Sequence, residues 1–550
     1  MVYKSTFADQ VIPDIDIYSF LMENNKHNAG PDGDNTIVSI DGHSDRTLTR
    51  GQVKDLSGRL GDGWINKVGL GKGDIVAVFA PNQYDHIVLY YSLLAAGCTI
   101  TPGNPAYTED EFHHQLSNSG AQTLITIPAL LPVLLKVCEK IGLPRHRIFL
   151  FGDDQVDGCK PFNSLISQDP RRRVSTPLKG INAADDVAFI CYSSGTTGVA
   201  KGVTLTHRNF VGQVLVNVNF DPVAIQEDDI LIAFLPFYHI YGATVIMNGF
   251  YRGTPVVVMS RFDLEHFCQL IERHKVTFAN IVPPVAVLLA KSPIVKKYDL
   301  SSIRNFGSGA APLGHEHIEA LKHQVPSEVR QGWGMTETTS GIIVQTMERN
   351  EPGSIGVLVS NNEAKIVDEN DNELPDNSAG ELLVRGVSIM KGYLNNDEAN
   401  AKTFTQDGWM RTGDIAVFNS KTQQFYIVDR IKELIKYKGL QVAPAELEAI
   451  LLGNDKVADC AVVGVYDAKE ATEYPRAYVV LQTGHEGTSA LAKELDAYVT
   501  EKVANHKKLR GGIRFVPAIP KSASGKILRK DIREWIKKEQ QQAQTKSARL

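Results

Sequence analysis

Strand-like and helix-like segments alternate along the first four-fifths of the chain, and this alternation constrains the fold more than any other feature. Residues 73–80 form an apolar run typical of a buried strand, and residues 82–97 follow as an apolar helix. Residues 108–120 then begin with Thr108 and Glu111, which are spaced as a helix capping box. Such βαβ repetition predicts largely parallel sheets that are flanked by helices.

The pattern changes at about Ala364, and a chain of 550 residues is too long for a single core. Residues 363–386 read as two short strands around turn residues, and a compact mixture of helices and strands follows them. We therefore predict an α/β fold with two domains. The large N-terminal domain, residues 1–428, contains βαβ-type sheets and a β-rich subdomain. A hinge at 429–432 joins it to a small α+β C-terminal domain at 433–550.

The composition excludes several classes of protein. The formal net charge of -5 has no large basic excess, which argues against nucleic acid as the main partner. The six cysteines are scattered without a C-x-x-C pair, which indicates reduced thiols rather than a disulfide framework or a zinc site. No apolar run is long enough to span a bilayer, and the N-terminus lacks the apolar core of a secretory signal.

The stretch 191–207, CYSSGTTGVAKGVTLTH, gathers hydroxyls, glycines and one lysine between a predicted strand at 185–192 and a predicted helix at 207–220. Ligands bind at such strand ends on open α/β sheets, and glycines let successive N–H groups approach an anion. The stretch therefore predicts a polyphosphate cradle, although a flexible Ser/Gly turn remains an alternative. The cradle residues are Ser193, Ser194, Gly195, Thr196, Thr197, Gly198 and Lys201.

A Walker A loop is the nearest rival interpretation of this stretch. That loop requires Gly directly before its lysine and Ser or Thr directly after it. Ala200 and Gly202 occupy those two positions beside Lys201, so the rival is excluded.

The same stretch resembles the signature of the adenylate-forming superfamily, which comprises acyl-CoA synthetases, 4-coumarate–CoA ligase-like enzymes, beetle luciferases and peptide-synthetase adenylation domains. Two residues depart from the family pattern. Ala200 stands where the family often has Pro, which suggests a more mobile loop, and Trp333 stands where it more often has Tyr. The resemblance covers nearly the whole chain, because further motifs follow in family order at residues 305–314, 330–339, 409–416, 428–448 and 520–533.

By this resemblance the motifs form one site for ATP. The indole of Trp333 offers a stacking face for adenine, Thr336 can donate to the α-phosphate, and Glu337 can hold Mg²⁺. Asp414 resembles the acid that accepts both ribose hydroxyls, and Arg430 resembles the second ribose contact. Besides the cradle residues, the expected ATP contacts are Gly309, Ala310, Ala311, Pro312, Gln331, Gly332, Trp333, Gly334, Thr336, Asp414, Arg430 and Lys526.

Two anions must meet in the first half-reaction, because a carboxylate attacks the α-phosphorus of ATP. Cations have to remove the repulsion and stabilise the charge that builds on the α-phosphate oxygens. Mg²⁺ and Lys201 can contribute, and the resemblance selects Lys526 as the lysine that reaches both reactants. The acyl-adenylate that forms can then be attacked by a thiol, with AMP as the leaving group.

The resemblance further implies that the thiol belongs to coenzyme A and that the C-terminal domain is mobile. The domain would swing about hinge residues Asp429 and Lys432, so that Lys526 leaves and the 436–441 loop enters. In that loop the resemblance implies contacts to CoA from Lys438 and Gly439, and walls of the second-step site from Lys436 and Gln441.

The positions that match the family's acid pocket carry mostly small or apolar side chains. His239 resembles the histidine that closes the pocket near the carboxylate, although a histidine after an apolar strand is more often a core residue. Gly307 stands where coumarate ligases can carry Lys, so we expect no charge there. An apolar acid is predicted, either aryl (cinnamate- or phenylacetate-like) or medium-chain. The pocket positions are His239, Tyr241, Val245, Gly307, Ala310, Gly334, Ser340 and Gly341.

The sequence thus predicts an ATP- and Mg²⁺-dependent acid–CoA ligase whose catalytic residues are Lys526, His239, Lys436, Gln441 and Thr336. Two alternatives stay open: a luciferase-type adenylating oxygenase, and a stand-alone adenylation enzyme that loads a carrier protein. The final residues, Ala548-Arg549-Leu550, resemble a peroxisomal address. They predict a peroxisomal import receptor as a partner and a peroxisomal location, with the cytoplasm as the alternative.

Overall fold

The computed structural model describes residues 1–22, 33–193, 200–221, 224, 226, 228–438, 440–467, 470, 472–522 and 525–547, with side chains as far as residue 539. Several predicted site residues lie outside the described residues, namely Ser194, Gly195, Thr196, Thr197, Gly198 and Gly439, as does the predicted address at 548–550.

The first large sheet has eight strands, and most of them run parallel, as the βαβ pattern predicts. Its flanking helices include α4 (Glu109–Ser119), which begins with the predicted capping box between Thr108 and Glu111. In spatial order the strands are β20 (Gly392–Tyr393), β10 (Lys201–Thr206), β9 (Val187–Ser193), β5 (Thr99–Gly103), β4 (Ile75–Phe79), β6 (Thr123–Thr126), β7 (Ile148–Leu150) and β8 (Lys160–Pro161).

One prediction for this sheet is wrong. The stretch after β9 does not lead directly into helix α6 (His207–Phe220), because strand β10 comes between them and pairs antiparallel with β9. Val203, Thr204 and Thr206 give residues 201–206 the β-branched content of a strand, which the prediction overlooked. The glycine–hydroxyl stretch therefore joins two antiparallel strands, and Lys201 is the first residue of the second one.

The second large sheet has nine strands and contributes many of the residues that line the cavity described below. Its central strands β11 to β15 are parallel, and Asn280, Gly307 and Arg330 lie in register on three neighbouring strands. In spatial order the strands are β17 (Val357–Leu358), β16 (Ser340–Val344), β15 (Glu328–Met335), β14 (Asn305–Ser308), β13 (Phe278–Ile281), β11 (Leu231–Ala233), β12 (Val256–Val258), β2 (Ile37–Asp41) and β3 (Thr47–Thr49).

The largest hydrophobic core joins the two large sheets through helices that are buried on nearly every face. These are α3 (His86–Ala95), α6 and α7 (Ile240–Arg252), whose residues pack against both sheets. No helix among the described residues is long and apolar enough to cross a membrane. The other α-helices that the structure describes before the C-terminal domain are α1 (Ile17–Met22), α2 (Arg50–Gly63), α5 (Leu131–Ile141), α8 (Leu264–His274), α9 (Pro283–Lys291), α10 (His315–Gln324) and α11 (Asp397–Thr403).

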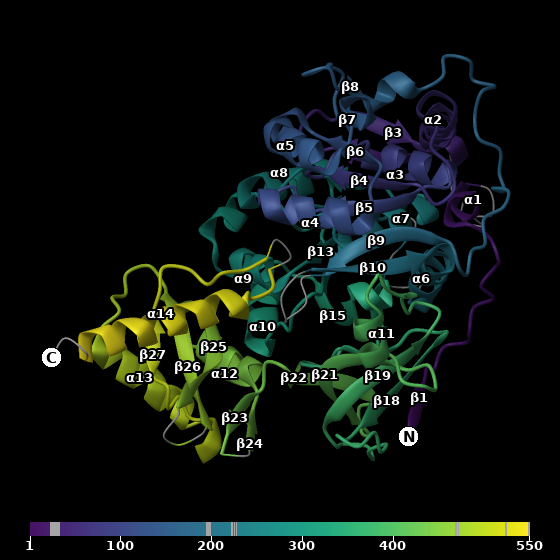
Figure 1. The fold of residues 1–550 in the computed structure, drawn as a ribbon. Helices are drawn as coiled ribbons and strands as arrows, with labels where there is room; N and C mark the ends of the chain where they lie inside the picture. Colours follow the sequence, from purple (N-terminus) through teal and green to yellow (C-terminus); the bar gives the residue numbers. More distant parts are fainter. Residues whose placement is uncertain are drawn as a thin grey trace.

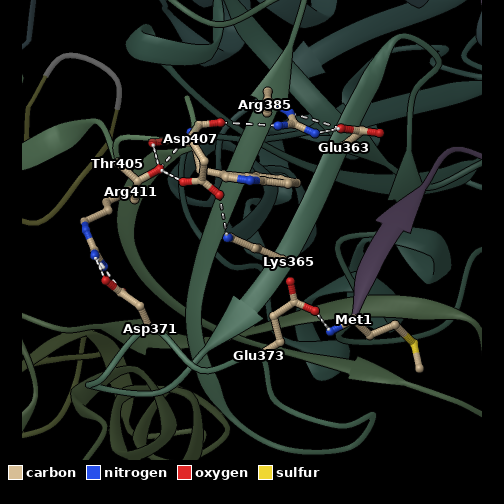
Figure 2. A network of polar contacts seen from close by, with 10 residues as sticks. Met1, Glu363, Lys365, Asp371, Glu373, Arg385, Thr405, Asp407 and Arg411 are labelled. Atoms are coloured by element: carbon tan, nitrogen blue, oxygen red, sulfur yellow. Dashed lines mark hydrogen bonds and ion pairs between the residues drawn. The ribbon is translucent and has the colours of Figure 1, made fainter.

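A third, antiparallel sheet forms the predicted β-rich subdomain, and the predicted hairpin at 363–386 corresponds to its two neighbouring strands β18 and β19. The amino terminus of the chain is attached to it, because β1 pairs with β18 and the Met1 amino group forms an ion pair with Glu373 (Figure 2). In spatial order the strands are β1 (Val2–Lys4), β18 (Asn362–Val367), β19 (Gly380–Gly386), β21 (Met410–Asn419) and β22 (Gln424–Arg430).

Polar contacts cover the outer face of this sheet, as Figure 2 shows. Trp409 is 2% exposed and lies between two cations, with Lys365 Nζ 4.9 Å and Arg385 Cζ 4.4 Å from its ring. Lys365 also pairs with Asp407, and Arg385 pairs with Glu363. These contacts account for the buried indole structurally, since the cations stack on it and are neutralised by acids.

The C-terminal domain has its own core and continues directly from β22 (Figure 1). The predicted hinge at 429–432 covers the last residues of β22 and the turn after it. The elements of this domain are the hairpin β23 (Ile435–Tyr437) and β24 (Leu440–Val442), the sheet of β25 (Val457–Asp467), β26 (Thr472–Leu481) and β27 (Ile513–Phe515), and the helices α12 (Pro444–Leu452), α13 (Ser489–Thr500) and α14 (Arg529–Ser547).

Candidate active site

A cavity of about 630 Å³ lies where the two large sheets, helix α7 and the C-terminal domain meet. Its lining brings together residues from every predicted motif, although these motifs are spread over more than 300 positions of the sequence. The predicted site residues that line it are Ser193, Lys201, His239, Tyr241, Val245, Gly307, Gly309, Ala310, Gln331, Gly332, Trp333, Gly334, Thr336, Glu337, Ser340, Gly341, Arg430, Lys432 and Lys526.

Some predicted residues do not line this cavity, among them Asp414 and Asp429, which are buried beside it. Ala311 and Pro312 lie on the turn after β14, beyond the lining residue Ala310. The β23–β24 hairpin, which carries the other three, lies away from α9, whereas the chain before α14 reaches toward that helix (Figure 1). Those three residues are Lys436 and Gln441, which are exposed, and Lys438, which pairs with Glu470 at 2.8 Å. This is the arrangement expected when Lys526, and not the 436–441 loop, is at the site.

Asp414 connects the aromatic ring and the arginine of the predicted nucleoside site. Trp333 Nε1 donates to Asp414 Oδ2 at 2.9 Å, and Arg430 Nε lies 3.0 Å from Oδ1 on the paired strand. Burial raises the pKa of Asp414, and Arg430 and Trp333 oppose that rise. The arginine is close but not aligned for a hydrogen bond, so Oδ1 is a buried acceptor without a donor among the described residues. A ligand hydroxyl fits this atom.

The tryptophan at position 333 therefore contributes more than a stacking face. The indole N–H fixes the ring to the carboxylate of Asp414, which a phenol in the same place would not do with the same geometry. The predicted adenine-stacking ring and the predicted ribose acid are consequently parts of one hydrogen-bonded unit.

Glu337 is 6% exposed and begins a second polar cluster where Ser193 and Lys201 line the cavity. Its Oε1 accepts hydrogen bonds from Ser193 Oγ at 3.1 Å and from Tyr393 OH at 2.9 Å. The described residues contain no group of three His, Cys, Asp or Glu side chains that could hold a metal. One carboxylate beside hydroxyls nevertheless fits Mg²⁺, which commonly takes one or two carboxylates together with phosphate oxygens and water.

Tyr393 lines the same cavity and is a functional candidate that the sequence reasoning missed. Its ring lies 4.7 Å from Lys201 Nζ, and its hydroxyl contacts Glu337. Burial and the neighbouring Glu337 carboxylate raise the pKa of Tyr393, so the phenol stays protonated and acts as a donor.

Lys526 reaches the cavity from the segment that precedes α14. Gly525 makes this approach possible, because its φ is +78° and an added Cβ would lie 3.1 Å from Pro284 of α9. Burial, reinforced by Arg430, lowers the pKa of Lys526 to about 8, while Glu433, Asp414 and Glu337 oppose that shift. A half-buried lysine that faces the acids of another domain is placed to meet an anionic ligand.

His239 caps helix α7 at the wall of the cavity. Its Nδ1 accepts the backbone N–H of Tyr241 at 3.3 Å. Burial, reinforced by Lys526, lowers the pKa of His239 to about 4. The ring is therefore neutral at physiological pH, and the proton that remains on Nε2 makes it a hydrogen-bond donor to the cavity.

The backbone is strained where β14 and β15 end at the cavity. Ala310, Thr339 and Ser340 have φ values of +69°, +51° and +91°, which cost non-glycine residues about 1–3 kcal/mol each. Side chains hold this conformation, since Thr339 Oγ1 donates to Ser388 O and Thr338 Oγ1 donates to Ser340 O, both at 2.7 Å. Such strain is typical of residues that a binding site positions.

Polar residues from neighbouring strands of the second large sheet form the far end of the cavity. Tyr241 OH donates to Asn280 Oδ1 and to Gly307 O at 3.1 Å each. Asn280, Gly307 and Arg330 are in register on neighbouring strands, and Gly307 has no side chain to fill the space between the other two. Gly307 itself brings no charge, but Arg330 on the neighbouring strand lines the cavity and pairs with Asp221 at 3.3 Å.

A nucleoside-sized polar site, a carboxylate for a cation and a lysine from a second domain, all on one cavity, are the features of an adenylate-forming enzyme. The family models agree: residues 26–394 match the AMP-binding enzyme family and residues 446–526 match the AMP-binding enzyme C-terminal domain. The chain belongs to the AMP-binding enzyme family.

The chain is similar to plant enzymes over its full length. It is 39% identical over 543 residues to 4-coumarate–CoA ligase 5 of Oryza sativa subsp. japonica, which covers 97% of each chain. It is 38% identical over 547 residues to 4-coumarate–CoA ligase 1 of Petroselinum crispum, covering 98% of this chain and 97% of the relative. These matches confirm the predicted family and the predicted enzyme class, an AMP-forming acid–CoA ligase.

Solved structures share the fold. The anthranilate CoA ligase AuaEII in complex with anthranoyl-AMP superposes with a TM-score of 0.86 at 24% identity, over 96% of this chain and 98% of that one. ATP-bound MatB from Rhodopseudomonas palustris has a TM-score of 0.83 at 25% identity, over 94% and 98%. The predicted fold class is confirmed.

Proposed function

We propose that this chain joins an aryl or medium-chain carboxylic acid to coenzyme A in two steps, with ATP and Mg²⁺ as co-reactants. The observation that carries the proposal is the convergence on one cavity of Lys526 from the C-terminal domain, Arg430 from the hinge, and Glu337 and Trp333 from the N-terminal domain. Each of these groups suits a different part of an adenylate and its anionic neighbours.

In the first step an oxygen of the acid's carboxylate forms a bond to the α-phosphorus, and the bond from that phosphorus to the pyrophosphate oxygen breaks. Lys526 offsets the negative charges of the two reactants, and the Thr336 hydroxyl donates to an α-phosphate oxygen. Neutral His239 offers its Nε2–H to the acid side of the cavity. Glu337 would hold Mg²⁺, which would supply charge neutralisation at the phosphates.

In the second step the thiol of CoA attacks the acyl carbonyl, and AMP leaves. Lys526 has to withdraw for the β23–β24 hairpin to bring Lys436 and Gln441 to the cavity, and we propose a rotation about residues 429–432. The present arrangement is secured by Asp429, which is buried and whose Oδ2 accepts the N–H of Ala445 at 3.1 Å. The rotation would have to exchange that bond.

The side chains that line the cavity beyond His239 limit the size of the proposed acid. Tyr241 and Phe278 offer aromatic walls, and Gly307 and Gly341 leave room between them. The Arg330–Asp221 pair closes the far end and is neutral overall, so a neutral acyl group remains compatible with it. The similarity to 4-coumarate–CoA ligases supports the aryl class.

The test is pyrophosphate exchange into ATP and CoA-dependent release of AMP, measured with Mg²⁺ and a panel of acids: cinnamate, 4-coumarate, phenylacetate, hexanoate and octanoate. Exchange without CoA, followed by thioester formation when CoA is added, supports the proposal. Exchange with no consumption of CoA would favour the loading of a carrier protein instead. Light or CO₂ release under oxygen would favour a luciferase-type reaction. No exchange with any of the acids would refute the proposal.

A further inference from the structure

Tyr393 contacts two opposite charges where Ser193 and Lys201 line the cavity. Its hydroxyl donates to Glu337 Oε1 at 2.9 Å, and its ring face lies 4.7 Å from the ammonium of Lys201. All three residues line the same cavity. One aromatic side chain therefore serves as the partner of a carboxylate at its edge and of a cation at its face.

The backbone holds this tyrosine firmly in place. Strand β20 is the edge strand of the first large sheet, and Tyr393 pairs with Val203 of β10, two residues after Lys201. Asn400 of α11 clamps the residue from the other side, because its Oδ1 accepts the N–H of Tyr393 at 2.7 Å and its Nδ2 donates to Tyr393 O at 3.0 Å. The ring is therefore fixed beside Lys201 by the sheet and not by the lysine.

The contact matters because Lys201 and Glu337 are oppositely charged groups in a cavity of lowered dielectric, where they attract each other strongly. Within the part of the chain that the structure describes, no ion pair joins them, and each contacts Tyr393 instead. A neutral ring is a weaker partner for the lysine than a carboxylate is, so an incoming phosphate can displace it easily.

We propose that Tyr393 is a positioning residue that keeps Lys201 and Glu337 apart in the nucleotide-free enzyme. Both charges then remain available, the cation for the phosphates of ATP and the carboxylate for its Mg²⁺. The inference rests on the proposed function in one respect, namely that the ligand is ATP.

The test compares Tyr393→Leu with Tyr393→Phe by calorimetric titration of the full chain with ATP in EDTA, so that no metal contributes. Tyr393→Leu removes the ring, and Lys201 becomes free to pair with Glu337. If Lys201 pairs with Glu337 in about nine-tenths of the enzyme molecules, the dissociation constant for ATP rises about tenfold. Tyr393→Phe keeps the ring and loses only the hydroxyl, so its metal-free affinity stays within about twofold of wild type.

A double-mutant cycle separates this mechanism from a simple loss of packing. In the Glu337→Gln background no carboxylate remains to capture Lys201, so the further change Tyr393→Leu has little effect on metal-free ATP binding, about twofold or less. Thermal unfolding of each variant reports whether the fold is intact, and Tyr393→Phe supplies a folded reference with the ring in place.

Three results would overturn the inference. The first is a Tyr393→Leu variant that binds metal-free ATP as wild type does. The second is an equal loss in the Glu337 and Glu337→Gln backgrounds, which would mean that the ring supports ATP without acting through the carboxylate. The third is a wild-type enzyme that binds no ATP at all, with or without Mg²⁺, and this result alone would also refute the proposed function.

Discussion

The most specific prediction concerns the charge on Lys526, which we propose as the cation that the C-terminal domain delivers to the acid and the α-phosphate. Burial and Arg430 lower the pKa of Lys526 to about 8, so the ammonium form is present below that pH and is lost as the pH rises through it. The protonated fraction in the free enzyme falls from about nine-tenths at pH 7 to about one-tenth at pH 9. We therefore expect kcat/KM for ATP in adenylation to fall about tenfold over this range.

The matched variant is Lys526→Arg, because a guanidinium keeps its charge throughout the range but does not reproduce the lysine geometry. We expect this variant to be slower at pH 7 by about 10²-fold, the scale of losing one aligned transition-state donor, and to lack the alkaline decline.

The assay is acid-dependent pyrophosphate exchange between pH 6.5 and 9.5, in which the variant corrects for the ionisation of ATP and pyrophosphate. A wild-type profile that does not decline above pH 8, or a Lys526→Arg profile that declines in parallel with it, would refute the assignment.

Three further predictions follow from the geometry of the cavity. Gly334→Ala should destabilise the protein and lower its Tm, because the new Cβ would lie 2.0 Å from Ser340 O. In Gly341→Ala the new Cβ would lie at an ordinary 3.6 Å from Val344, so this variant should fold normally but react more slowly with the bulkier acids of the panel. Asp414→Asn weakens the charge-assisted contacts of the carboxylate and should raise the KM for ATP about 10- to 100-fold without lowering Tm appreciably. His239→Gln keeps a neutral donor and should retain more adenylation activity than His239→Leu; equal rates for the two would contradict the donor role.

Features that depend on local sequence could be predicted well. The apolar runs of β4 and its parallel neighbours, and the Thr108–Glu111 capping box, depend on residues close together in the chain. The motif residues converge because most of them follow the carboxyl ends of parallel strands, which meet at one edge of a sheet. The strand β10 was missed because glycine and lysine at its start made residues 201–206 look like a continuation of the loop.

The contacts between distant segments could not be predicted. Tyr393 meets Glu337 across 56 positions, and Arg330 meets Asp221 across 109. Of these four residues only Glu337 stands out in its own segment. The hydrogen bond between Trp333 and Asp414 likewise depends on the packing of β15 against β21, which brings an indole N–H to a buried carboxylate. Such pairs follow from tertiary packing, and sequence spacing carries no signal for them.

The peroxisomal address at residues 548–550 stays a prediction. A fluorescent fusion that leaves Leu550 free, compared with one that lacks the last three residues, tests it: the prediction requires peroxisomal import of the first fusion and its loss in the second.

The central claim is tested most directly by a single-turnover experiment with ATP labelled in its α-phosphate, Mg²⁺ and an accepted acid. Without CoA, the label should accumulate as acyl-adenylate in an amount close to that of the enzyme, and on addition of CoA it should appear as AMP in step with the thioester. Thioester formation with no acyl-adenylate, or with the label released as ADP, would contradict the account.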